Sequence, residues 1–273
     1  MTAVGLEIMR DPRVRGVEWR DLVALSRWEV VKELCLPVPW LGASLLLAGW
    51  AWSWPVLFTP ALGCSFVFFL TGLRVVHNAH HYALGLPRWA TELVMFVMSV
   101  LMLGSMHAVQ RNHLRHHKNC MDDEDLEGYS ARLSAWRALL YGPVFLVRLH
   151  VRGFRLGRRR HRRWILAELT AGALWVYFVL ALSDGFALWY HVGVMAIGQC
   201  MTSFFAVWTV HHDCDRSGQI ARTLRGKVKN RISFEMFFHL EHHLFPKVPT
   251  SHLPRLADRL DSAAPELQAH QVF

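Results

Sequence analysis

Four long apolar stretches, separated by polar segments, dominate the pattern along the chain. They cover about residues 37–54, 56–74, 164–183 and 186–210. A helix of about 20 mainly apolar residues crosses a bilayer, so each stretch predicts a transmembrane helix. Only Trp54 and Pro55 join the first two stretches, and Ser183–Gly185 joins the last two. The pattern therefore predicts an all-α integral membrane protein, with four transmembrane helices arranged as two tight hairpins in one domain that covers residues 1–273.

A fifth apolar run, residues 93–108, has a different composition. It is rich in methionine and contains Gly104, Ser105 and His107. Runs of this length are more often buried or interfacial segments than membrane spans. Histidine-rich segments precede and follow the run, and a crossing here would place them on opposite faces of the membrane. We therefore predict that the run does not cross, with a fifth span as the alternative.

Basic residues mark one side of the predicted membrane protein. All 30 lysines and arginines lie in residues 1–36, 74–88, 111–163 and 211–273, and the turns inside the two hairpins hold none. Cytoplasmic segments carry the excess of Lys and Arg. Both termini and a helical cap, made of residues 75–163 and 211–273, are therefore expected in the cytoplasm, on a bacterial inner membrane. The basic segment 152–164 is expected to touch anionic lipid headgroups, and no nucleic-acid partner is expected.

Histidine is the most informative residue type of the polar segments. The chain has 17 histidines, and 11 of them lie in four clusters. Three clusters read HNAHH (77–81), HLRHH (113–117) and HLEHH (239–243), and the fourth is the pair His211 and His212. Positions i, i+3 and i+4 share one face of a helix. Neutral imidazole is the commonest metal ligand in proteins, so the clusters predict a metal site.

The number of histidines indicates how many metals they bind. One zinc ion takes at most four protein ligands in a structural site, so eight to ten imidazoles would overfill it, whereas two metals would use them. The five cysteines form no CxxC motif, which argues against thiolate ligands. Imidazoles with open metal positions suit iron that handles oxygen. The Glu-x-x-His motif of ferritin-like di-iron bundles is absent. A haem carrier or a histidine-rich metal transporter is the rival class.

The three longer clusters, in this order and among four predicted spans, resemble the histidine boxes of the membrane fatty acid desaturase superfamily. The resemblance covers about residues 40–257, and HLFPKVP in the third cluster is similar to the ending of the family's third box. It implies a non-haem di-iron centre with two Fe ions and O2 as co-substrate. The implied ligands are His77, His81, His113, His116, His117, His239, His242 and His243, completed by His212 or, as the less favoured choice, His211.

Two residues depart from the family's first box. An additional histidine, His80, makes both HxxH and HxxxH spacings possible ligand pairs with His77. Asn78 stands where the family often has an acidic residue.

A run of acidic residues follows the second box. These side chains are candidates to orient the ligand histidines, and a solvated acidic loop is the alternative. The run consists of Asp122, Asp123, Glu124, Asp125 and Glu127.

The resemblance implies oxidation of C–H bonds of a lipid-like acyl chain by O2 and two electrons, with desaturation as the expected reaction. A hydroxylase, ketolase or oxidative decarboxylase on the same site is the alternative. The substrate is expected to be linked as a thioester or to a lipid. Because the chain has no flavin, haem or iron–sulfur motif, an external electron donor, a ferredoxin or small cytochrome with its reductase, is the expected partner.

Six histidines lie outside the four clusters. His107 is expected in the core or in a substrate channel. The others are expected to be structural, namely His150, His161, His191, His252 and His270.

Overall fold

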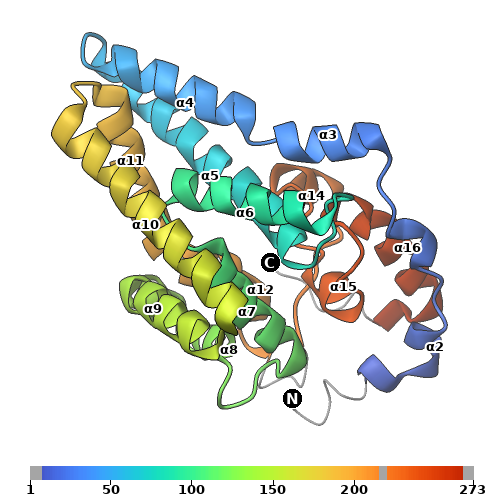
Figure 1. Ribbon diagram of the computed structural model, residues 1–273. Coiled ribbons are helices and arrows are strands. Elements are labelled where there is room, and N and C mark those ends of the chain that lie inside the picture. The colour runs from blue at the N-terminus through green and yellow to red at the C-terminus, as the bar shows by residue number, and fades with distance from the viewer. Residues whose placement is uncertain (1–7, 215–219, 267–273) are drawn as a thin grey trace.

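The computed structural model describes residues 8–214 and 220–266, and its regular elements are helices (Figure 1). Three of the described segments are long and apolar enough to cross a membrane: α3 (Arg27–Cys35) with α4 (Val38–Ala51), α5 (Phe58–His80), and α10 (Arg159–Leu182). Two bent pairs also qualify: α6 (Arg88–Met102) with α7 (Met106–Lys118), and α11 (Phe186–Cys200) with the π-helix η3 (Ser203–Trp208) and α12 (Thr209–His211). The all-α, multi-pass membrane fold is confirmed. With three to five candidate spans, the four-helix hairpin topology stays a prediction.

The first hairpin consists of α4 and α5, with a short 3-10 turn at Pro55–Leu57 between them. Its outer face is apolar and uncovered, since Leu46 and Trp50 are both more than 60% exposed. The inner face carries a chain of hydroxyl groups: Ser44 and Ser65 lie 2.6 Å apart, and Ser65 lies 2.9 Å from the Tyr190 hydroxyl of α11. Polar side chains within a membrane need such partners, so these contacts join three helices where water is excluded.

The fifth apolar run doubles back on itself. Leu103 has a left-handed backbone (φ 56°) that ends α6, and Ser105 begins α7 by accepting a hydrogen bond from a backbone N–H of its first turn. The axes of α6 and α7 differ by 112°. As a result, His113 on α7 returns to His77 on α5, with 5.0 Å between ring centroids. That residues 93–108 do not cross the membrane stays a prediction, because α6 and α7 together also qualify as one bent span.

The long helix α9 (Ala135–Leu156) packs unusually close to its neighbours at two glycines. A Cβ atom on Gly142 would lie 1.5 Å from the carbonyl oxygen of Cys200, and one on Gly153 would lie within 3 Å of Ala108 on α7. The helix α8 (Leu126–Ala131) precedes α9 and packs beside η3. Together α8 and α9 hold α7, which carries the second histidine box, against the membrane helices.

The C-terminal part forms a separate corner of the molecule. It contains α14 (Lys227–Ile232), α15 (His239–Leu244), a 3-10 turn (Thr250–His252) and α16 (Leu253–Ala263). The N-terminal helix α2 (Pro12–Arg15) and a 3-10 turn (Arg20–Leu22) pack against it. In Figure 1 this corner lies at the end of the molecule opposite to the turn between α10 and α11. Its core is a cluster of buried apolar side chains that includes Leu22, Leu253, Leu256 and Leu260.

A buried ion network fixes the end of α5. The guanidinium of Arg74 pairs with the carboxylates of Glu33 on α3 and of Glu235. One turn later, Asn78 donates a hydrogen bond to Glu33 (3.2 Å), and its side-chain oxygen accepts one from the Thr250 hydroxyl (2.7 Å). Asn78, which departs from the family pattern, thus links three regions of the chain. The network holds the part of α5 that carries the first histidine box.

Candidate metal centre

The four histidine clusters meet at one place although they lie far apart in the sequence. The first is at the C-terminal end of α5, the second is on α7, the pair follows η3, and the third is on α15. The donor atoms form two sets of four, and within each set all atoms lie within 4.8 Å of one another. One set comes from His77, His81, His113 and His242, and the other from His116, Cys120, His211 and His243. The chain therefore offers two neighbouring positions for a metal ion.

Two further histidines join these sets. The Nε2 atom of His117 lies 3.1 Å from that of His113 and 2.9 Å from that of His242. The Nε2 atom of His239 lies 3.0 Å from that of His211. We call His77, His81, His113, His117 and His242 the first imidazole group, and His116, His211, His239 and His243 the second imidazole group.

The spacing of the ring nitrogens fits ligands of a shared metal. At four contacts, Nε2 atoms of different histidines lie 2.9–3.1 Å apart. Two nitrogens bound at about 2.1 Å to one metal, and at right angles to each other, would be separated by about 3.0 Å. Right angles between neighbouring ligands occur in both five- and six-coordinate metal sites.

The pair His116 and His211 shows why a cation belongs there. Nδ1 of His116 lies 2.7 Å from a carboxylate oxygen of Asp125, and Nδ1 of His211 lies 2.9 Å from the carbonyl oxygen of Ile220. Both oxygens can only accept, so both Nδ1 atoms carry the proton. The two Nε2 atoms face each other at 3.1 Å, so they must share a cation, which is either a proton on one ring or a metal ion.

Unsatisfied nitrogens support the same conclusion. In the described part of the chain, both ring nitrogens of His77 and the Nε2 atoms of His81 and His243 are buried without a hydrogen-bond partner. Buried polar atoms in proteins are nearly always paired. Metal ions bound by the two imidazole groups would supply a partner for one nitrogen of each of these three rings.

Burial also keeps the third box ready to bind a metal. It lowers the pKa of His239, His242 and His243 well below the usual value, and neighbouring imidazoles lower it further. These rings are therefore neutral at physiological pH. The neutral imidazole is the form that ligates metals.

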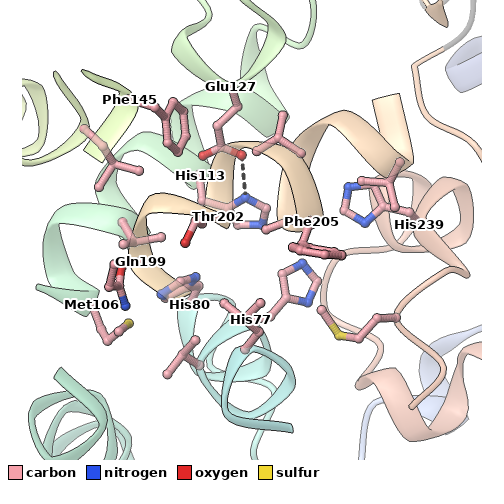
Figure 2. Close-up of a pocket in the computed structure, with 18 of the residues that line it drawn as sticks. His77, His80, Met106, His113, Glu127, Phe145, Gln199, Thr202, Phe205 and His239 are labelled. Atoms are coloured by element: carbon pink, nitrogen blue, oxygen red, sulfur yellow. Dashed lines mark hydrogen bonds and ion pairs between the residues drawn. The ribbon is translucent and has the colours of Figure 1, made fainter. Parts of the chain in front are cut away.

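Two acidic side chains orient imidazoles of the second box. Besides the contact of Asp125 with His116, a carboxylate oxygen of Glu127 lies 3.1 Å from Nδ1 of His113 (Figure 2). Both contacts turn Nε2 toward the other histidines, as carboxylates do for many metal-binding imidazoles. Other acids of the run have different surroundings: Glu124 pairs with Arg115, and the side chain of Asp123 is fully exposed. Part of the acidic run therefore orients histidines, and part of it is a solvated loop, as the two interpretations of the sequence proposed.

The structure separates the two histidines of the fourth cluster. His211 belongs to the second imidazole group, whereas His212 stacks on Trp208 with 4.3 Å between ring centroids. Nδ1 of His212 donates a hydrogen bond to the Trp208 carbonyl (3.0 Å). The helix α12 ends at His211, and His212 has extended backbone (ψ 140°). The sequence favoured His212 as the ligand, but the geometry favours its neighbour.

The extra histidine of the first box also separates from its neighbour. His81, just after the end of α5, belongs to the first imidazole group. His80 is buried and lines an adjoining cavity instead. The geometry therefore favours the His77 and His81 pair.

The other histidines have local partners. Nε2 of His150 accepts a hydrogen bond from the Ser105 N–H (2.9 Å), and Nε2 of His191 donates to the Leu101 carbonyl (2.9 Å). His252 contacts the Leu22 carbonyl through Nδ1 (2.8 Å). These contacts fit a structural role.

Three histidines remain. His107 pairs with Glu168 (2.6 Å) and stacks on Trp164, away from the residues that line the cavity. His161 is half-buried within the basic segment 152–164. His270 lies outside the described residues.

One donor near the metal positions escaped the sequence analysis. Cys120 contributes its sulfur to the second set of donor atoms. The absence of CxxC motifs argued against thiolate ligands, but a single cysteine can join histidines of another segment. The signal was its distance of four residues from His116, which places the two on one side of a helical turn.

An apolar cavity of about 90 Å³ adjoins the imidazoles (Figure 2). His77 and His113 of the first imidazole group and His239 of the second form part of its wall. Most of the remaining wall is aliphatic or aromatic, with Phe145 and Phe205 among its larger side chains. Ligand sites of proteins are usually apolar cavities with a few polar groups at defined places.

The comparisons with known proteins agree with this geometry. A search of curated proteins found no match. A comparison with protein families matches residues 51–273 to fatty acid desaturases. The matched segment contains all four histidine clusters, both acidic side chains that orient them, and the whole cavity wall. The chain is therefore a multi-pass membrane enzyme that belongs to the fatty acid desaturase family.

Proposed function

We propose that the protein uses two Fe ions, O2 and two electrons to desaturate an acyl chain that it takes from the membrane. The observation that best supports this proposal is the two sets of four donor atoms, each set within 4.8 Å, next to an apolar cavity that His77, His113 and His239 help to line. Membership of the desaturase family supports the same reaction class. When bound, the two irons supply the redox chemistry that couples reduction of O2 to oxidation of an unactivated C–H bond.

Each imidazole group would hold one iron. The first group offers five imidazoles and the second offers four, so neither fills six positions with histidine. Imidazole ligands combined with open positions suit iron that reacts with oxygen. Glu127 and Asp125 would keep one histidine of each group in the tautomer and orientation that ligation needs.

A second cavity indicates how an acyl chain reaches the irons. It has a volume of about 350 Å³ and lies between α5, η3 and α14. Its wall shares five residues with the inner cavity, namely Leu73, Phe205, Ala206, Met236 and Phe237. Phe66, on the outer wall, is 44% exposed on the apolar surface of α5. An acyl chain would pass from the bilayer, through the outer cavity, to the inner one.

Phe205 lines both cavities. It lies on the π-helix η3, an element that is rare and frequently found at functional sites. Its ring packs edge-on against Phe66, with 5.4 Å between centroids. A modest rotation of this ring would open or close the connection. The same apolar walls would exclude water from the reacting carbon.

The balance of desaturation fits the proposed inputs. Two neighbouring methylene groups each lose one hydrogen, O2 takes up four electrons and four protons in total, and two waters leave. The substrate supplies two of the electrons, and the external donor supplies the other two. A hydroxylase would use the same inputs but return one oxygen atom to the substrate. The choice depends on where the cavity holds the chain, because small displacements change which step follows.

We further propose a cytoplasmic active site and a separate acidic electron donor. All 30 lysines and arginines lie in segments that the positive-inside rule assigns to the cytoplasm. Arg158, Arg159 and Arg163 are exposed at the start of α10. Such a basic surface attracts an acidic partner, and salt weakens the attraction.

Mass spectrometry of lipids from expressing cells tests the reaction. Wild-type protein should produce acyl chains that carry one additional double bond. His212→Ala should keep this activity, because His212 lies outside both imidazole groups, whereas His211→Ala should abolish it. Hydroxylated chains without new double bonds would refute desaturation. New double bonds formed by His211→Ala would refute the assignment of the site.

A further inference from the structure

The second metal position contains a sulfur atom. Sγ of Cys120 lies 3.9 Å from Nε2 of His116, and it belongs to a set of four donor atoms that all lie within 4.8 Å of one another. The Cys120 side chain is buried, at 2% exposure. The other members of the set are His116, His211 and His243, so the sulfur faces the same point as three imidazoles of the second group.

The local structure holds this sulfur in place. The helix α7 ends at Lys118, and Cys120 follows its C-cap residue, four positions after His116. The carbonyl oxygen of Ile220 accepts hydrogen bonds both from Cys120 Sγ (3.3 Å) and from Nδ1 of His211 (2.9 Å). While Cys120 carries its proton, one backbone carbonyl therefore orients two of the donors; the hydrogen bond from Cys120 is given up when the sulfur becomes a thiolate, and the one from His211 is kept.

The distances fit a sulfur and a nitrogen on one metal. Typical bonds are about 2.3 Å for metal–sulfur and about 2.1 Å for metal–nitrogen. At a ligand angle of about 120° these bonds separate the two atoms by about 3.8 Å, close to the 3.9 Å between Cys120 and His116. Donors on opposite sides of one metal would be separated by about 4.4 Å. The four donor atoms of this set all lie within 4.8 Å of one another.

The number of imidazoles leaves room for this ligand. The first imidazole group has five members and the second has four. A sulfur from Cys120 would give both metals five protein ligands. The alternative to a metal ligand is that Cys120 is a small apolar residue of the core, as free cysteines often are. Cys214 is an example, since it is fully buried in the same apolar cluster but belongs to neither set of donor atoms.

We propose that Cys120 is the fifth protein ligand of the second metal and binds it as a thiolate. The proposal rests on the two-metal centre described above. On binding, the S–H bond breaks, a metal–sulfur bond forms, and the proton leaves to solvent, with no change in oxidation state. The thiolate adds a negative charge next to the metal, so it should favour the more oxidised state of that metal.

Cobalt substitution of the full-length protein tests this ligand without relying on activity. Bound to Co²⁺, the wild-type protein should show an intense near-ultraviolet sulfur-to-cobalt charge-transfer band. Cys214→Ala, the matched buried control, should keep the band, and Cys120→Ala should lose it. Loading should also release one proton more per chain from wild type than from Cys120→Ala.

X-ray absorption of the iron-loaded wild type keeps the proposal testable if Cys120→Ala does not fold. We expect one sulfur scatterer for every two irons, at about 2.3 Å. Two bound metals with only nitrogen and oxygen neighbours, and no charge-transfer band, would overturn the thiolate ligand and leave the two-metal centre intact. A protein that binds no metal would overturn the proposed function as well.

Discussion

Replacing Asp125 with asparagine changes a single atom of the carboxylate that holds His116. One oxygen of Asp125 accepts hydrogen bonds from Nδ1 of His116 (2.7 Å) and from the Met121 N–H (2.9 Å). The other accepts one from the Glu127 N–H (3.1 Å) at the start of α8. Asparagine has only one side-chain oxygen, so at least one of these donors must face the new NH2 group. The substitution keeps the volume and removes the charge and one or two hydrogen bonds.

The magnitude follows from those contacts. Loss of a partner that orients a ligand histidine costs about 10–100-fold in metal affinity, or about 1.4–2.7 kcal/mol. Because His116 belongs to the second imidazole group, the loss should concern one of the two metals. Each donor left unsatisfied also costs about 1–3 kcal/mol of folding free energy. We therefore expect Asp125→Asn to retain about one tightly bound metal per chain and to unfold at a lower temperature.

Titration of the metal-free protein with Fe²⁺ or Co²⁺ measures this effect. Asp123→Asn is the matched control, because the Asp123 side chain is fully exposed and lies 3.5 Å from Arg132. It should bind both metals as wild type does. If Asp125→Asn bound both metals with unchanged affinity, the claim that Asp125 orients a ligand would be wrong.

Three further predictions concern the substrate path and the fold. Phe205→Trp should obstruct the connection between the two cavities and lower turnover about tenfold or more while the metal content stays unchanged; unaltered turnover would mean that the acyl chain takes another route. Gly142→Ala should destabilise the protein by about 3 kcal/mol or more, as overpacking does, because its Cβ would lie 1.5 Å from the Cys200 carbonyl oxygen. Gly172→Ala, whose Cβ would have nothing within 4 Å, should keep the wild-type thermal midpoint. Equal midpoints for the two variants would contradict the close approach at Gly142. Arg74→Met should cost about 3–5 kcal/mol of folding free energy in denaturant unfolding, because it leaves the buried carboxylate of Glu33 without its cation; a cost below 1 kcal/mol would show that the network is dispensable.

The sequence predicted the helical membrane fold and the meeting of the histidine clusters because both depend on local patterns. Apolar length identifies membrane helices, and i, i+3, i+4 spacing identifies histidines that share a helix face. The number of crossings was harder to predict. It depends on the bend after α6, where Leu103, and not the neighbouring Gly104, takes the left-handed backbone conformation.

The choice between neighbouring histidines could not be read from spacing. An α-helix turns about 100° per residue, so a small change in helical register decides which of two adjacent side chains faces the metal. The π-helix η3 makes such a change just before His211, and the end of α12 turns His212 away. The end of α5 at His80 likewise separates His80 from His81. Cys120 was missed because its role depends on His211 and His243, which come from distant segments.

Metal analysis of the purified protein tests the central claim most directly. The two imidazole groups predict about two irons per chain, with no haem absorption band, and His211→Ala should lower the iron content where His212→Ala does not. One zinc ion per chain, or a haem spectrum, would contradict the di-iron centre and the function built on it.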